Sequence, residues 1–265
     1  MRFLMLVSAL VFLLGSRPGM AEEMPEHHDT KPNLTLLVDE ELLLPVSQLA
    51  RHYASHSATP ITVLPKDGPM AANQIGQGLE AHVLITANSE LLDNLTSQGL
   101  TDVSSNHAVA RTQLALVGPE NLQRQGLFAR HISFAAILVA TPELPIYITG
   151  ADHVEGNRAA KLMEGFEFSD ALKARAVIVP DRAAQLAAMR AKPGLALMLA
   201  ADAIGVPDMA IISLLPSELS VPVDYRAVVL ASESMQDSRL LNSFLSSPEA
   251  LEILNHFGFQ APPAK

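Results

Sequence analysis

Short apolar runs alternate with amphipathic segments along most of the chain. The runs are four or five residues long and rich in Leu, Ile and Val, as expected of buried strands, and the segments between them have a helical spacing of apolar residues. This alternation is typical of an α/β sheet protein, in which helices cover the faces of a sheet. The pattern predicts strands at residues 34–38, 61–64, 83–86, 113–117, 146–149, 176–179, 195–199 and 227–231.

The order of strands and helices predicts two lobes. The last predicted strand and the two helices after it have no sheet of their own, so we expect them to return to the first sheet. Residues 33–117 together with 224–265 then form lobe 1, and residues 118–223 form lobe 2. Two crossings between the lobes predict a type II clamshell with its cleft at the C-terminal ends of the strands. The predicted helices are residues 45–54, 71–78, 89–98, 157–166, 182–190, 237–245 and 248–256.

The first 21 residues have the pattern of a secretory signal peptide. A charged start, an apolar run too short to span a bilayer and a stretch of small residues ending at Ala21 follow one another. Residues 22–32 are polar and interrupted by Pro, so we predict a flexible leader, in which the role of His27 and His28 stays open. We therefore expect an exported, periplasmic protein. The lack of Cys fits a domain that is held together by its core alone.

Charge and composition argue against several kinds of function. The formal net charge is −10, and loss of Arg2 and Arg17 with the signal peptide takes it to −12, so we expect no nucleic-acid partner. Trp is absent and aromatic residues make up 5% of the chain, which argues against a site that stacks sugars or bases. The sequence contains no nucleophile elbow, zinc-protease helix or phosphate-binding loop. We therefore predict no enzymatic activity and no cofactor.

Three consecutive carboxylates follow the first predicted strand. Asp39, Glu40 and Glu41 stand where a strand meets a helix, at a place where free backbone N–H groups and the helix dipole favour negative charge. One interpretation is that these acids only cap the helix and face solvent. The other is that they line the cleft, where oxygen-rich turns suit an organic cation or a metal ion. The metal candidates are Glu40, Glu41, Asp67 and His153.

Four stretches carry the most distinctive motifs of the chain. Residues 36–53 end in LARHY, residues 72–93 read ANQIGQGLEAHVLITANSELLD, residues 149–160 read TGADHVEGNRAA, and residues 248–259 read PEALEILNHFGF. In this order they resemble segments of the periplasmic molybdate-binding proteins of ABC importers, which have the type II solute-binding fold. The resemblance implies a protein that closes two lobes on a small solute and delivers it to a permease in the inner membrane. We expect it to act as a monomer.

The resemblance also implies where a ligand would bind. In that family an oxyanion is held by serine and tyrosine hydroxyls and by backbone N–H groups at helix N-termini. The first serine position corresponds here to Glu41, and the second to Asp67 or Gly68. One amide position corresponds to Glu155 and Gly156, and the other to Asp181. The tyrosine position corresponds to Leu199.

No serine or tyrosine hydroxyl stands at these matched positions, and carboxylates stand at several of them. An ionised carboxylate ~4 Å from a dianion costs about 4 kcal/mol at an effective dielectric of about 20. Three hypotheses therefore stay open. The ligand is an oxyanion by resemblance, or it is a metal ion or organic cation by local charge, or the chain is a divergent accessory protein that has lost solute binding.

Overall fold

The structure is a computed structural model, and it describes residues 31–66, 71–124 and 133–263. The predicted signal peptide and nearly all of the leader, including His27 and His28, lie outside the described residues, as do Asp67 and Gly68. Within the described ranges, no helix is long and apolar enough to cross a membrane.

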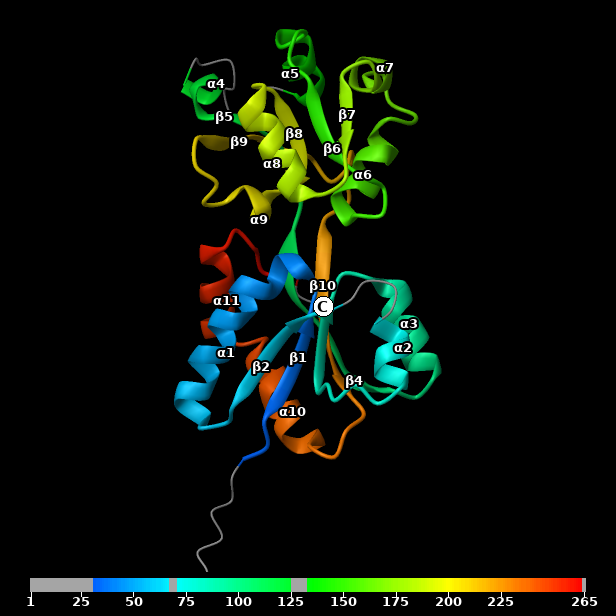
Figure 1. The fold of residues 1–265 in the computed structure, drawn as a ribbon, viewed down its shortest axis with the longest axis vertical. Helices are drawn as coiled ribbons and strands as arrows, with labels where there is room; N and C mark the ends of the chain where they lie inside the picture. Colours follow the sequence, from blue (N-terminus) through cyan, green and yellow to red (C-terminus); the bar gives the residue numbers. More distant parts are fainter. Residues whose placement is uncertain (1–30, 67–70, 125–132, 264–265) are drawn as a thin grey trace, which may run out of the picture. The chain divides into compact units, whose positions relative to one another are not determined.

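Two five-stranded sheets organise the chain (Figure 1). The first has the order β2-β1-β3-β10-β4 and consists of β1 (Leu34–Val38), β2 (Ile61–Pro65), β3 (Val83–Thr86), β4 (Thr101–Thr112) and β10 (Val223–Leu230). The second has the order β7-β6-β8-β5-β9 and consists of β5 (Leu114–Pro119), β6 (Ile146–Thr149), β7 (Ala176–Val179), β8 (Leu195–Leu199) and β9 (Met209–Leu214). The predicted α/β class is confirmed.

Parallel pairing brings the ends of several strands to one edge of each sheet. In the first sheet β1 is parallel to β2 and β3, and in the second β6 is parallel to β7 and β8. The other strands pair antiparallel, including β10 with β3 and β4. The turns that follow β1, β3, β6 and β8 therefore lie at the C-terminal edges of the two sheets, where ligands bind in open α/β sheets.

The first crossing between the sheets differs from the expected one. Strand β5 pairs with β8 and β9, so residues 114–117, which the pattern placed in lobe 1, belong to the second sheet. The chain thus leaves the first sheet at Gln113, between β4 and β5. An apolar run predicts that a strand is buried, but it does not indicate to which sheet the strand belongs.

Helices cover the sheets, and side-chain caps start several of them. Asn88, Ser133, Asp181 and Ser247 each accept a hydrogen bond from the backbone N–H three residues further on, as helix N-caps do. The helices are η1 (Glu40–Leu42), α1 (Leu43–Ser57), α2 (Ala71–Gly76), α3 (Ser89–Ser97), α4 (Glu120–Arg124), α5 (Phe134–Ala140), α6 (Val154–Leu162), α7 (Ser169–Lys173), α8 (Arg182–Ala191), α9 (Ala200–Ala203), α10 (Met235–Phe244) and α11 (Pro248–His256).

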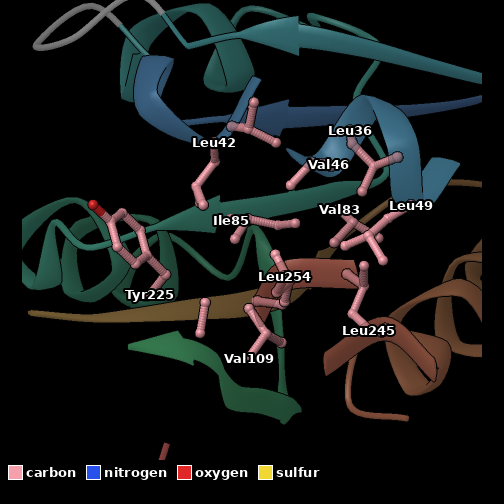
Figure 2. Close-up of a cluster of buried hydrophobic side chains, with 14 of the residues drawn as sticks. Leu36, Leu42, Val46, Leu49, Val83, Ile85, Val109, Tyr225, Leu245 and Leu254 are labelled. Carbon is pink, nitrogen blue, oxygen red and sulfur yellow. The ribbon is translucent and has the colours of Figure 1, made fainter. Parts of the chain in front are cut away.

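The first sheet is buried on both faces. Leu36 and Val38 of β1 pack into a cluster with α1, α10 and α11, whereas Leu37 packs with α2 and α3 on the other face. This is the period of two that a strand requires. Figure 2 shows the larger cluster, in which the fully buried Tyr225 lies at one side of the aliphatic side chains and its hydroxyl points away from them. Leu199, the last residue of β8 in the second sheet, packs into this same cluster.

Candidate functional site

The turn after β1 is held in place by its first carboxylate. Asp39 is 5% exposed and accepts a hydrogen bond of 2.8 Å from the backbone N–H of Ala87, which follows β3. Its other oxygen lies 3.2 Å from Nζ of Lys66, which follows β2. Asp39 therefore joins the ends of three neighbouring strands, and its charge is matched by a lysine.

The next carboxylate in the turn, Glu41, points back to the sheet. Its Oε1 accepts a hydrogen bond of 2.8 Å from the hydroxyl of Tyr225 on β10. Burial, and then the negative charge of Asp39, raise the pKa of Glu41 from 4.5 to about 7, although the hydrogen bond from Tyr225 acts in the opposite direction. Glu41 therefore exchanges a proton near neutral pH.

The turn after β6 has a carboxylate of its own. Glu155, in the first turn of α6, is 8% exposed and accepts a hydrogen bond of 3.1 Å from the hydroxyl of Thr149, the last residue of β6. The neighbouring Gly156 sets how closely α6 approaches β6, because a Cβ there would lie 1.9 Å from the carbonyl oxygen of Gly150. Glu155 thus occupies the positive end of its own helix.

The turn after β8 supplies a third buried acid. Asp202 of α9 is 7% exposed and forms an ion pair with Arg182 at the start of α8. Burial raises the pKa of Asp202 to about 6, Arg182 opposes this rise, and the charges of Glu155 and Glu40 add to it. Arg182 therefore compensates only part of the cost of burying this carboxylate.

Acidic residues that follow strands of the two sheets raise one another's pKa through their charges. The charge of Asp202 in the second sheet raises the pKa of Glu41 in the first, and the charge of Glu40 in the first raises the pKa of Asp202 in the second. The turns after β1, β6 and β8 thus contribute to one electrostatic cluster, which we call the junction cluster: Asp39, Glu40, Glu41, Glu155, Arg182, Asp202 and Tyr225. Such a cluster can donate or accept hydrogen bonds and can take up or release protons near neutral pH.

A sequence model described as a bacterial extracellular solute-binding protein matches residues 34–260. The chain belongs to this family. The family expected from the sequence is therefore confirmed, and it is a family of solute-binding proteins rather than of enzymes. No curated protein sequence matches the chain.

Solved structures support the fold of this solute-binding protein. The substrate-binding domain of a putative molybdenum ABC transporter from Clostridium difficile has a TM-score of 0.76 at 16% identity, and the alignment covers 87% of this chain and 99% of that one. The periplasmic molybdate-binding protein of Azotobacter vinelandii has a TM-score of 0.64 at 17% identity, over 87% and 100% of the two chains. Iron-bound HitA from Pseudomonas aeruginosa has a TM-score of 0.61 at 17% identity, over 88% and 89%. These likenesses confirm the type II fold.

The other residues predicted to bind a ligand or a metal ion, Asp181, His153 and Leu199, each have a different environment in this solute-binding protein. Asp181 caps α8 by accepting a hydrogen bond of 2.7 Å from the N–H of Ala184. His153 precedes α6, with its Nε2 3.0 Å from the carbonyl oxygen of Pro180. Leu199 is 1% exposed and has no polar side-chain atom to offer a ligand. Among the described residues, no three His, Asp or Glu side chains come together as a metal site, so Glu40, Glu41 and His153 do not form one there.

Three members of the junction cluster were not among the predicted site residues. Asp202 repeats the pattern of the turn after β1, with an acid shortly after a buried strand, so its position was available from the sequence. Tyr225 lies 184 positions from Glu41, and Arg182 lies 20 positions from Asp202. No local pattern links residues so far apart, so these partners were found only in the structure.

Proposed function

We propose that this protein is the solute-binding component of an ABC importer and captures a small solute outside the cytoplasm. The solute binds without covalent chemistry at the junction cluster, the two lobes close on it, and a permease in the inner membrane receives it. The protein acts as a monomer. The observation that carries the proposal is that buried polar groups from the turns of both sheets converge on one cluster, which a solute between the sheets can bridge.

We propose a small oxyanion, such as molybdate or tungstate, as the solute. The resemblance in sequence and the likeness in fold to molybdate-binding proteins support this choice. An oxyanion binds here only while Glu41 is neutral, because an ionised carboxyl at ~4 Å that no cation compensates costs about 4 kcal/mol. Glu41, with a pKa of about 7, can meet this condition close to neutral pH, whereas the charge of Asp202 is balanced in part by Arg182. A protonated carboxyl is a hydrogen-bond donor, as a serine hydroxyl is.

We assign different roles to the residues that the sequence proposed. Glu41 and Glu155 contact the solute, the backbone at Gly156 lies beside it, and Leu199 forms an apolar wall. Asp181 stabilises α8 without contacting the solute. Asp67 and Gly68, which lie outside the described residues, stay predicted contacts.

An organic cation is the second candidate solute, and the surplus of acids favours it. The junction cluster has five carboxyl groups, and in the part of the chain described only two of them form an ion pair, Asp39 with Lys66 and Asp202 with Arg182. The remaining negative charge could be balanced by a cationic amine. The two candidates differ in the sign of their proton linkage. An oxyanion raises the pKa of neighbouring carboxyls and takes up protons on binding, whereas a cation lowers it and releases protons.

A thermal-shift experiment on the protein without residues 1–21 tests the proposed function. Molybdate, tungstate, divalent metal ions and polyamines are added at pH 6.5 and pH 8.5, with sodium chloride of equal ionic strength as the control. We expect molybdate or tungstate to raise the melting temperature, and more so at pH 6.5. A shift with polyamines alone, larger at pH 8.5, would establish the cation instead. No shift with any solute at either pH would contradict solute binding of the kind proposed.

A further inference from the structure

Glu41 differs in its partner from Asp39 and Asp202, the two ion-paired carboxyls of the junction cluster. Asp39 is paired with a lysine and Asp202 with an arginine. Within the described residues Glu41 has no ion pair, and its side-chain partner is the neutral hydroxyl of Tyr225. An ionised Glu41 thus lacks the compensating positive charge that Asp39 and Asp202 have.

The charged and titratable groups around Glu41 are mostly acidic. Its own turn contributes Asp39, β10 contributes Tyr225, and α9 contributes Asp202. Behind these partners lie the groups that act on them. Lys66 forms an ion pair with Asp39, and Arg158 interacts electrostatically with Tyr225. The charges of Arg182, Glu155 and Glu40 shift the pKa of Asp202. The two charged groups that shift the pKa of Glu41, Asp39 and Asp202, are therefore both negative, and the positive groups are partners of these neighbours.

We infer that Glu41 sets the charge of the solute that this protein accepts: its carboxyl takes up one proton from solution before an anionic solute occupies the site, and it then donates a hydrogen bond to that solute. This inference rests on the proposed function. The proton comes from water and returns to it on release, and no bond to the solute is formed or broken. The repulsion between an ionised Glu41 and an anionic solute is thereby replaced by a hydrogen bond from the protonated Glu41 to the solute.

The expected effect follows from the proton equilibrium of Glu41. With a pKa of about 7, roughly a tenth of the protein has a protonated Glu41 at pH 8 and roughly a hundredth at pH 9. If only this form binds an anion, the apparent Kd rises about fivefold from pH 7 to pH 8 and about tenfold from pH 8 to pH 9. Glu41→Gln removes this dependence, because its amide is neutral at every pH and keeps an oxygen for the Tyr225 hydroxyl.

Isothermal titration with molybdate at pH 7, 8 and 9 tests the inference. The unsubstituted protein should lose about fiftyfold in affinity from pH 7 to pH 9, whereas Glu41→Gln should lose little. Glu90→Gln is the matched control, since it removes a carboxylate from an exposed position in the first turn of α3, outside the junction cluster. It should keep the steep dependence of the unsubstituted protein.

The possible results separate this inference from the proposed function. An affinity that is the same from pH 7 to pH 9, or a Glu41→Gln protein with an unchanged pH dependence, overturns the role of Glu41 and leaves oxyanion binding intact. A folded protein that binds no oxyanion at any of these pH values overturns both.

A second variant tests the inference if Glu41→Gln does not fold. Tyr225→Phe keeps the carboxyl and the buried ring but removes the hydrogen bond that favours the ionised form of Glu41. The loss of affinity for molybdate should then begin at a higher pH than in the unsubstituted protein. A loss that begins at a lower pH contradicts the inference.

Discussion

Glu41→Gln should stabilise the ligand-free protein at alkaline pH. The pKa of Glu41 is about 7 in the folded protein and 4.5 in the absence of structure. This difference corresponds to about 3 kcal/mol of unfolding free energy, at 1.36 kcal/mol per pKa unit. Because Glu41 is partly exposed, solvent screening reduces the expected gain to about 2 kcal/mol. For a domain of this size the gain equals roughly 4–8 °C in melting temperature.

The sign follows from proton binding in the two states. Between pH 4.5 and pH 7 the folded protein holds a proton on Glu41 that the unfolded chain has lost, so the unfolding free energy falls as the pH rises through this range. The cost is absent below pH 4.5 and complete above pH 7. Gln does not ionise, so the variant avoids the cost and gains stability at pH 8, with little change at pH 4.5.

Urea denaturation of the unsubstituted protein, Glu41→Gln and Glu40→Gln at pH 4.5 and pH 8 measures this effect. Glu40→Gln controls for the loss of one negative charge from the same turn, and it should shift the midpoint much less because its side chain is exposed. The reasoning is refuted if Glu41→Gln is no more stable than the unsubstituted protein at pH 8, or if its gain is the same at both pH values.

Two further substitutions test the turns of the second sheet. Arg182→Gln removes the partner of the buried Asp202, so we expect a loss of about 1–3 kcal/mol at pH 8 in urea denaturation and a smaller loss at pH 4.5, where Asp202 is protonated; equal losses at both pH values would contradict this. Gly156→Ala places a Cβ 1.9 Å from a backbone oxygen, so we expect a loss of about 2 kcal/mol or more in the same assay. Gly76→Ala, where the nearest atom is 3.7 Å away, is its control and should cost nothing; equal effects of the two substitutions would show that α6 does not need this close approach.

Most of the fold was predictable because its central strands are buried on both faces. Such strands read as continuous apolar runs, and β1, β3, β6 and β8 were found at their observed positions. Strand β4 was missed because much of it is polar and half-exposed, so its sequence has neither an apolar run nor a strict alternation. The partner sheet of β5 was also missed, since sheet membership depends on contacts distant in sequence.

The site was predictable turn by turn but not as a cluster. Acids after buried strands pointed to Glu41 and Glu155, and the structure places both in the junction cluster. The sequence did not show that Tyr225 donates to Glu41 or that Arg182 pairs with Asp202. These pairings show that Asp202 has a positive partner and Glu41 a neutral one, and the inference about Glu41 rests on this contrast.

The most direct test of solute binding by this protein is the number of protons exchanged when molybdate binds. Calorimetric titrations at pH 8 in buffers of different ionisation enthalpy give this number without any substitution. We predict saturable binding of one molybdate with net uptake of about one proton. Absence of saturable binding by the folded protein, or net release of protons on binding, would contradict the account.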